Sequence, residues 1–252
     1  MNYNKKFKEL LDTLPENEIV GLGNPNSKIL FIGKEPGTEI DTEIYHGSVK
    51  SWKEMKHNYA KRFVPDPKNP KESKLRHLNH TWQKYQKVHD TVLSLLSITD
   101  NKDRKDKYEI TFVENVFTSE LSNLPARNTR SAKKQPNFVA ELSKRKLTFF
   151  KSEFIQSFPV IVIFATDNKY IETYPGEVCE LFNVKFDKLY NYSGKDKIWL
   201  HSSSSPDNNP KLLIHTRQLT NSISKELIIS ISEIIAKFIQ ENSLNIITTD
   251  NQ

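Results

Sequence analysis

Polar side chains follow three of the apolar runs that we expect to form strands. Glu35 comes directly after the run 29–32, within the stretch Gly33-Lys34-Glu35-Pro36-Gly37. Asn115 ends a second expected strand, and His215 ends a later one, where it is followed by Thr216 and Arg217. Ligands of open parallel sheets bind beyond the carboxyl ends of the strands. A carboxylate, an amide and an imidazole at that edge could recognise a planar hydrogen-bonding group and stabilise charge on both sides of a breaking bond.

Each of these residues also has a purely structural interpretation. Glu35 would fit a turn or a helix cap, Asn115 is a common turn former, and His215 would fit a hydrogen-bonded core position. His77 and His80 lie three residues apart, but no third metal ligand accompanies them in a recognisable frame. We therefore predict no metal site, and the chemistry depends on whether the strand-end residues meet.

The pattern of apolar residues predicts which elements carry these side chains. Helical spacing is present at 5–14, at 81–96 and in the last helix, which Ser224 would cap. Strands are expected at 28–32, in a stretch ending near Asn115 or Val116, within 159–168 and at 211–215, with a strand pair or hairpin at 183–190 and 197–201. Helices between strands predict an α/β fold with three layers, α/β/α, and a mainly parallel central sheet. We expect one domain over residues 1–241 and a polar tail over 242–252.

Positive charge is concentrated in two segments of the chain. Residues 50–90 hold 11 Lys and Arg against 4 Asp and Glu, and residues 127–146 hold 7 against Glu141 alone. Because the whole chain carries a net charge of +6, the remainder is acidic. Basic segments on an acidic body are typical of nucleic-acid binding, and a lysine-rich solvated surface is the alternative interpretation.

Composition excludes several classes of protein. No apolar run approaches the roughly 18 residues that a membrane-spanning helix needs. Cys179 is the only cysteine, which excludes an internal disulfide framework and any four-cysteine metal or iron–sulfur site. Because the first residues lack the apolar core of a secretory signal, we expect a cytoplasmic protein, and we expect it to be a monomer.

The order of the motifs resembles that of the uracil-DNA glycosylase superfamily. In that family a strand is followed by G-x-x-P-G or a related turn, and residues 33–37 fit this frame. The segment "FVENVFTSEL", residues 112–121, looks like the one whose asparagine reads the edge of uracil. Residues 150–170 are similar to the helix and strand that come next, and "LLIHTRQLT", residues 212–220, looks like the final histidine motif. The resemblance covers about residues 28–240 and implies the fold of that family.

The resemblance also implies an activity, the hydrolysis of the N-glycosidic bond of uracil or a related base in DNA, without a cofactor. Glu35 would orient the attacking water, His215 would donate a hydrogen bond to the carbonyl of the leaving base, and Asn115 would bind the base edge. The remaining base-binding residues would be Gly33, Pro36, Gly37 and Tyr45, with Trp52 as the other candidate for the stacking aromatic. Lys34, Thr216 and Arg217 would contact the DNA backbone.

The chain departs from the family pattern at two catalytic positions. Glu35 is one methylene longer than the aspartate of the commonest branch, and His215 is followed by Thr216-Arg217 in place of Pro-Ser. These departures leave open a second function, a catalytically inactive protein of the same fold that binds nucleic acid or a nucleotide. A small-molecule α/β hydrolase is a third possibility, although the chain has no G-x-S-x-G motif.

Overall fold

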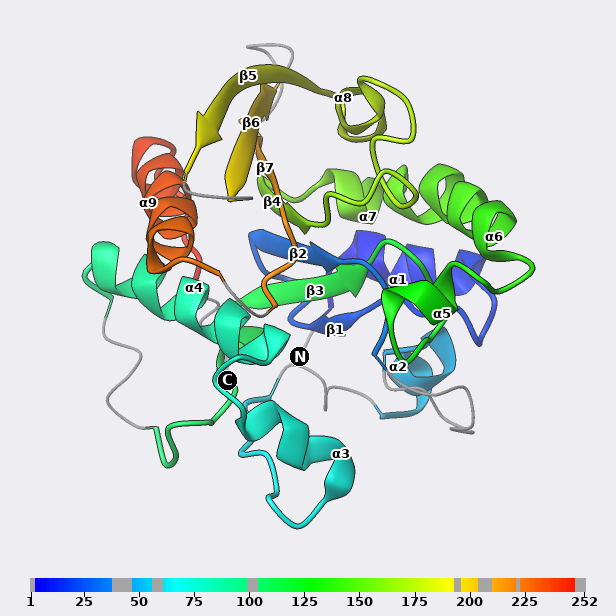
Figure 1. The fold of residues 1–252 in the computed structure, drawn as a ribbon, viewed down its shortest axis with the longest axis horizontal. Coiled ribbons are helices and arrows are strands. Elements are labelled where there is room, and N and C mark those ends of the chain that lie inside the picture. The colour runs from blue at the N-terminus through cyan, green and yellow to red at the C-terminus, as the bar shows by residue number, and fades with distance from the viewer. Residues whose placement is uncertain are drawn as a thin grey trace.

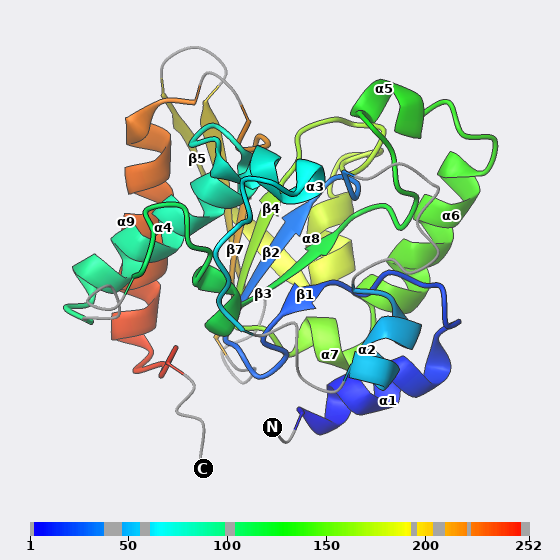
Figure 2. The same cartoon turned by 90° about the horizontal axis from the view of Figure 1, so that it is seen from below.

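The computed structural model describes residues 3–37, 47–55, 61–98, 104–192, 196–203, 210–220 and 223–247. Figures 1 and 2 show a central sheet with helices on both of its faces. None of the described helices is long and apolar enough to cross a membrane. The α/β class predicted from the sequence is confirmed.

Seven strands and nine α-helices are described. The strands are β1 (Leu22–Gly23), β2 (Ile29–Gly33), β3 (Val116–Glu120), β4 (Val160–Phe164), β5 (Val184–Asn191), β6 (Lys197–Ser203) and β7 (Leu212–Thr216). The helices are α1 (Lys5–Thr13), α2 (Val49–Met55), α3 (Pro70–Ser73), α4 (Thr81–Leu95), α5 (Thr129–Ala132), α6 (Phe138–Arg145), α7 (Glu153–Gln156), α8 (Glu177–Phe182) and α9 (Lys225–Glu241). Short 3-10 helices precede α4 (η2, Lys74–Arg76) and β3 (η4, Phe112–Glu114), and a π-helical turn, η5 (Lys146–Phe150), follows α6.

The strands are arranged in the order β1-β3-β2-β4-β7-β6-β5. The four central strands, β3, β2, β4 and β7, are parallel to one another, and the three outer strands run antiparallel to their neighbours. The centre of the sheet is therefore parallel, as predicted. The strands β5 and β6 form the predicted hairpin. All four central strands have their carboxyl ends at one edge, which Figure 2 shows at the same end of the molecule as α5.

Each face of the sheet packs against its own set of helices. Leu30 and Ile32 of β2 lie in a core with residues of α1, α6, α7 and α8, whereas Ile29 and Phe31 lie in a core with residues of α4 and α9. The alternation follows from the two-residue period of a strand, and burial on both sides explains the uncharged run in β2. Figure 1 shows α4 and α9 together on one side of the sheet.

The predicted position of the second central strand is wrong. We expected it to end near Asn115, but β3 begins at Val116 and runs to Glu120. Residues 112–114, the β-branched and aromatic part of the predicted strand, form η4, in which Phe112 and Val113 are buried. Tertiary packing of these apolar side chains overrides the strand propensity of the segment.

The polar tail predicted from Asn242 onward also differs from the structure. Helix α9 ends at Glu241 as expected, and the Ser224 hydroxyl caps its first turn by accepting a hydrogen bond from the Leu227 amide at 3.0 Å. Beyond the helix, however, Ile246 is buried and Leu244 packs against the same core as α9. These two apolar side chains attach the beginning of the tail to the domain.

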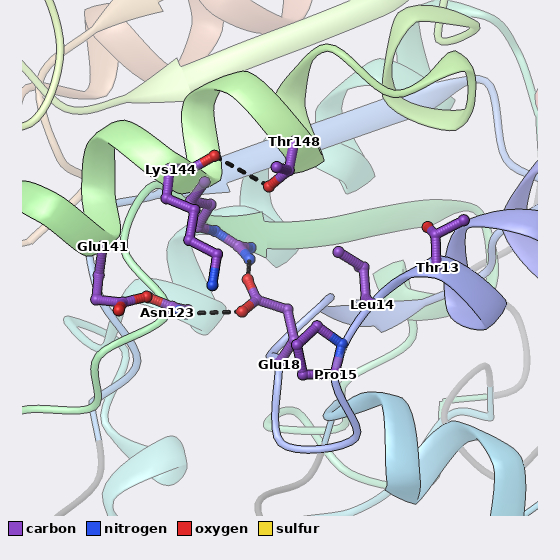
Figure 3. Close-up of a pocket in the computed structure, with 9 residues that line it drawn as sticks. Thr13, Leu14, Pro15, Glu18, Asn123, Glu141, Lys144 and Thr148 are labelled. Atoms are coloured by element: carbon purple, nitrogen blue, oxygen red, sulfur yellow. Dashed lines mark hydrogen bonds and ion pairs between the residues drawn. The ribbon is translucent and has the colours of Figure 1, made fainter.

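A buried ion pair connects the carboxyl end of β3 to the first loop of the chain. The Arg145 guanidinium, 1% exposed, donates to the Glu18 carboxylate at 2.5 Å, to the Ser119 hydroxyl at 3.1 Å and to the Glu120 main-chain carbonyl at 3.0 Å. The amide of Asn123 donates to the second oxygen of the Glu18 carboxylate at 2.8 Å (Figure 3). Arginine suits this position because its fixed fork of donors reaches three acceptors at once.

We expect Arg145→Met to lower the free energy of unfolding by about 3–5 kcal/mol, because the buried Glu18 carboxylate loses its partner. The double variant Glu18→Gln/Arg145→Met should recover part of that loss, since no unpaired charge then remains. Urea unfolding of the two variants and the wild type measures both values. A loss below about 1 kcal/mol for Arg145→Met would show that the pair contributes no more than an exposed one.

Candidate functional site

The centre of the sheet contains a topological switch point. The chain leaves β2 for β3 on one side and then crosses to β4 on the other side of β2. Crevices for ligands form where the connections from two neighbouring parallel strands diverge in this way, beyond the carboxyl ends of the strands. In this protein that position lies between the residues that follow β2 and those that follow β4, and it includes Glu35.

A chain of hydrogen bonds holds Glu35 at this edge. The Thr129 hydroxyl, on α5, donates to Glu35 Oε1 at 2.8 Å and accepts from the Lys34 ammonium, also at 2.8 Å. One hydroxyl thus joins a cation to a carboxylate. The second oxygen, Glu35 Oε2, is buried and has no hydrogen-bond partner among the described residues. An unpaired buried carboxylate oxygen is costly, and it indicates a position where a ligand or water donates a hydrogen bond.

Tyr170 is the neighbour of Glu35 on the β4 side of the switch point. Its side chain is fully buried, its ring packs edge-on against Phe138, and the Lys34 ammonium lies 5.8 Å from the ring centroid. Burial, and then the nearby Glu35 carboxylate, raises the pKa of the phenol. Part of the effect of Glu35 is a hydrogen-bonding contact between its carboxylate and the Tyr170 hydroxyl, although this contact does not reach full hydrogen-bond geometry. The Tyr170 hydroxyl and Glu35 Oε2 therefore meet at this edge, one from each strand end, and neither has another described partner.

Glu120 supplies a second carboxyl group at the same edge. It is the last residue of β3, level with Gly33 of β2, and one of its carboxyl oxygens would lie 2.1 Å from a Cβ atom built on Gly33. A side chain at position 33 would displace this carboxyl group, so Gly33 allows Glu120 to lie over the end of β2. Lys34, Glu35, Glu120, Thr129 and Tyr170 are called the carboxylate site below.

The two carboxyl groups of the site are close enough to influence each other. Burial, and then the negative charge of Glu35, raises the pKa of Glu120 well above its usual range, while Arg145 and Lys34 oppose the shift. On the other face of the sheet, the Tyr85 hydroxyl of α4 is buried without a described partner. Burial, and then the charge of Glu120, raises the pKa of Tyr85. Like charges this close disfavour each other, so Glu120 holds its proton more tightly than an isolated glutamate does.

His215 lies at the same edge but is already engaged. It is level with Ile163 of β4, its ring stacks on that of Trp199 at 5.3 Å, and the ring Nε2 lies 2.5 Å from the Ala165 carbonyl oxygen, to which it donates. Burial lowers the pKa of this imidazole, so the ring is neutral at pH 7. His215 is therefore a hydrogen-bonded core histidine, which is the structural interpretation given above. The structure does not support its role as a donor to the leaving base.

The two residues after His215 are likewise bonded within the protein. The Thr216 hydroxyl donates to the Lys197 carbonyl at 2.6 Å, and the Arg217 guanidinium pairs with Asp196 at 3.1 Å. Asp196 also accepts from the Ser224 amide at 3.1 Å. These bonds attach β7 to β6 and to the start of α9, so the structure does not support a role for Thr216 and Arg217 at the DNA backbone.

Asn115 lies at the opposite edge of the sheet from Glu35, and its assignment to the same site is wrong. It precedes β3, is buried, and its amide nitrogen lies 3.4 Å from Nε2 of His89. The error has a physical origin, because the strand begins where we expected it to end. The full length of β3 separates Asn115 from Glu120.

The remaining predicted base-binding residues differ in their burial. Pro36 is buried and its carbonyl accepts from the Ala126 amide at 3.0 Å, while Gly37 is exposed with open space around its α-carbon. Trp52 is excluded as a stacking aromatic, because it is 2% exposed and its indole donates to the Gly21 carbonyl at 2.8 Å. Tyr45 lies outside the described residues, within 38–46.

Exposed basic side chains surround α5, the helix that carries Thr129. Arg127, Arg130 and Lys134 are exposed, and the described part of the chain provides no ion-pair partner for them. Within the same segment, Lys133 pairs with Asp167, Arg145 with Glu18 and Lys146 with Glu177. Part of the basic segment is thus paired within the protein, whereas Arg127, Arg130 and Lys134 beside the carboxylate site are not paired with any residue that the structure describes.

A separate cavity of about 350 Å³ lies between α1 and α6 (Figure 3). Glu18, Asn123 and Arg145 line it, and the Glu18 carboxylate is already bonded to the other two. Because the Glu18 carboxylate in this cavity is already paired with a guanidinium, we place the candidate site at Glu35 and Glu120 instead. Among the described residues, no group of His, Cys, Asp and Glu is arranged to hold a metal ion.

Sequence reasoning found Glu35 and Lys34 but missed Glu120, Thr129 and Tyr170. Glu120 was visible as the last residue of the alternating run "VFTSE", and a correct strand boundary would have placed it at the edge. Thr129 and Tyr170 carry no comparable signal. Both lie in connections, 94 residues and more from Glu35 along the chain, and only the packing of α5 and of the β4 loop brings them to it.

Comparison of the chain with models of known protein families found no match, and comparison with curated proteins found no relative.

We expect Tyr170→Phe to leave the free energy of unfolding unchanged or to raise it by about 1 kcal/mol, because the hydroxyl is buried without a hydrogen bond. Urea unfolding measures this value. Tyr174→Phe is the matched control, since the Tyr174 hydroxyl is exposed and donates to Glu180 at 2.8 Å. A loss of more than about 1 kcal/mol for Tyr170→Phe would show that the hydroxyl is bonded in the folded protein.

Proposed function

We propose that this protein hydrolyses the N-glycosidic bond of uracil or a related deaminated base in DNA, with Glu35 as the residue that acts on the water and the sugar. The observation that carries the proposal is the unpaired, buried oxygen of Glu35 at the switch point of the sheet. The order of the sequence motifs, which resembles that of the uracil-DNA glycosylase superfamily, supports it.

The reaction needs a carboxylate where the structure holds one. As the bond from C1′ to the base nitrogen breaks, the electron pair leaves with the base and the sugar becomes a cation. Glu35 Oε2 would accept a hydrogen bond from the attacking water and receive its proton, while the negative charge of the carboxylate favours the cation. Thr129 donates to the other oxygen and itself accepts from Lys34, so Oε2 is the oxygen that would act on the water.

DNA as the partner is supported by the exposed basic residues beside the site. Arg127, Arg130 and Lys134 surround α5, whose Thr129 bonds Glu35 directly. Phosphate contacts made there would position a nucleotide at the carboxylate site, after the base has been rotated out of the helix at a cost of a few kcal/mol.

An inactive nucleic-acid-binding protein of the same fold is the second candidate. The engaged His215 favours it, because the charge on the leaving base then lacks the imidazole donor that the resemblance implies. Both candidates require the same basic surface, and they differ only in whether the glycosidic bond is cleaved.

Release of uracil, hypoxanthine or xanthine from single- and double-stranded DNA separates the two candidates. We expect release by the wild type and a fall of about 10²–10⁴-fold for Glu35→Gln, which keeps the size of the side chain but removes its basicity. Glu141→Gln, a change at the first turn of α6, is the matched control and should retain activity. Absence of release on every substrate would eliminate the enzyme and leave the binding protein.

Salt dependence of DNA binding tests the basic surface on its own. Each of Arg127→Ala, Arg130→Ala and Lys134→Ala should reduce the slope of log affinity against log salt by about one unit for every phosphate that the wild-type side chain neutralises. Lys237→Ala, on α9, is the control and should leave the slope unchanged. Equal slopes for all four variants and the wild type would place the DNA elsewhere.

A further inference from the structure

We infer that Glu120, as a neutral carboxylic acid, donates a hydrogen bond to the carbonyl of the leaving base, which makes the substrate a lactam base with a ring N–H beside a C=O. This inference rests on the proposed function, and it assigns to Glu120 the donor role that the sequence suggested for His215.

The position of Glu120 supports this role. Its carboxyl group lies over Gly33, one strand away from the connection that carries Glu35, at the edge where ligands of such sheets bind. The residue keeps part of its surface exposed, and its carboxyl group makes no hydrogen bond or ion pair with the residues that the structure describes. The group that Arg145 contacts at this residue is the main-chain carbonyl. The carboxyl group is therefore open to a ligand.

The buried Tyr170 hydroxyl gives a further indication of a polar ligand. Tyr170 is fully buried, and its hydroxyl makes no hydrogen bond of full geometry with the described residues. It lies within the electrostatic range of both Glu35 and Glu120. Unpaired buried groups are rare, and a bound molecule would supply the missing partner.

The charges that face Glu120 determine its protonation. Glu35 is the nearest negative group, Lys34 and Arg145 are the positive groups, and the two phenols are neutral. Burial and Glu35 dominate and raise the pKa of Glu120 well above its usual range. A neutral carboxyl group offers one donor and one acceptor side by side, which matches the C=O and N–H of a lactam edge. An ionised group would offer two acceptors and would repel a carbonyl oxygen.

The two carboxyl groups complete a balanced reaction. As the C1′–N bond breaks, its electron pair delocalises onto the base carbonyl oxygen, to which the O–H of Glu120 donates a hydrogen bond while keeping its proton. Water adds to C1′ and gives one proton to Glu35. That proton then passes from Glu35 to the departing base, so both carboxyl groups end as they began, and the net reaction consumes one water and releases the neutral base.

Two substitutions of Glu120 distinguish the acid from the carboxylate. Glu120→Met removes the donor, and the rate of base release should fall by about 10²–10³-fold. Glu120→Gln restores a donor beside an acceptor without a titratable proton, and should recover most of the loss. The wild-type rate should decline as the pH rises through the raised pKa of Glu120, whereas the rate of the Gln variant should not. If Gln is as damaging as Met, the ionised carboxylate is required and the inference is overturned.

Binding and stability test the inference separately from catalysis. DNA containing 2′-fluoro-2′-deoxyuridine, whose glycosidic bond resists cleavage, should bind the wild type and the Gln variant similarly and the Met variant at least tenfold more weakly. Because the folded protein holds a proton that the unfolded chain releases, wild-type stability is complete at acid pH and is lost as the pH rises through the raised pKa. The urea midpoint of Glu120→Gln should lack this decline. Equal binding by all three proteins, or parallel stability profiles, would refute the inference even if no base is released.

Discussion

Two carboxyl groups at one edge of the sheet constrain the rest of the candidate site. Glu35 and Glu120 come from neighbouring parallel strands, and their proximity makes simultaneous ionisation unfavourable. The surrounding residues give the two carboxyl groups different environments. Thr129 donates to one oxygen of Glu35 and itself accepts from Lys34, whereas the carboxyl group of Glu120 accepts no hydrogen bond from the described residues, and its pKa is raised by burial and by Glu35. Two residues of the same type thereby acquire different chemistry.

The supporting structure holds this pair in place from both sides. Gly33 leaves the space that the Glu120 carboxyl group occupies, and Arg145 bonds the main chain of Glu120 while pairing with Glu18. Helix α5 supplies Thr129 to Glu35, and the loop after β4 supplies Tyr170. Each of these contacts comes from a different connection, so the site depends on the order of the strands as much as on the residues themselves.

The resemblance in the motif order and the geometry of the site agree in part. Both place Glu35 after the first central strand, beside a basic segment. They disagree on the other two positions, the donor and the base-binding amide, because the His215 ring donates a hydrogen bond to the Ala165 carbonyl and Asn115 lies before β3. A carboxylic acid in place of the imidazole is a chemically sufficient substitute, since both donate one hydrogen bond to a developing oxyanion.

The sequence by itself determined the α/β class, the presence and approximate positions of β2, β4, β7 and α9, and the place of Glu35 after β2. These features depend on local apolar periodicity and on the turn at 33–37, which neighbouring residues decide. Only the tertiary structure decided where β3 begins, because burial of Phe112 and Val113 outweighs their strand propensity. It also decided the pairing of Glu120 with Glu35 and the burial of Tyr170, since contacts between distant segments depend on strand order and packing, which a local pattern does not encode.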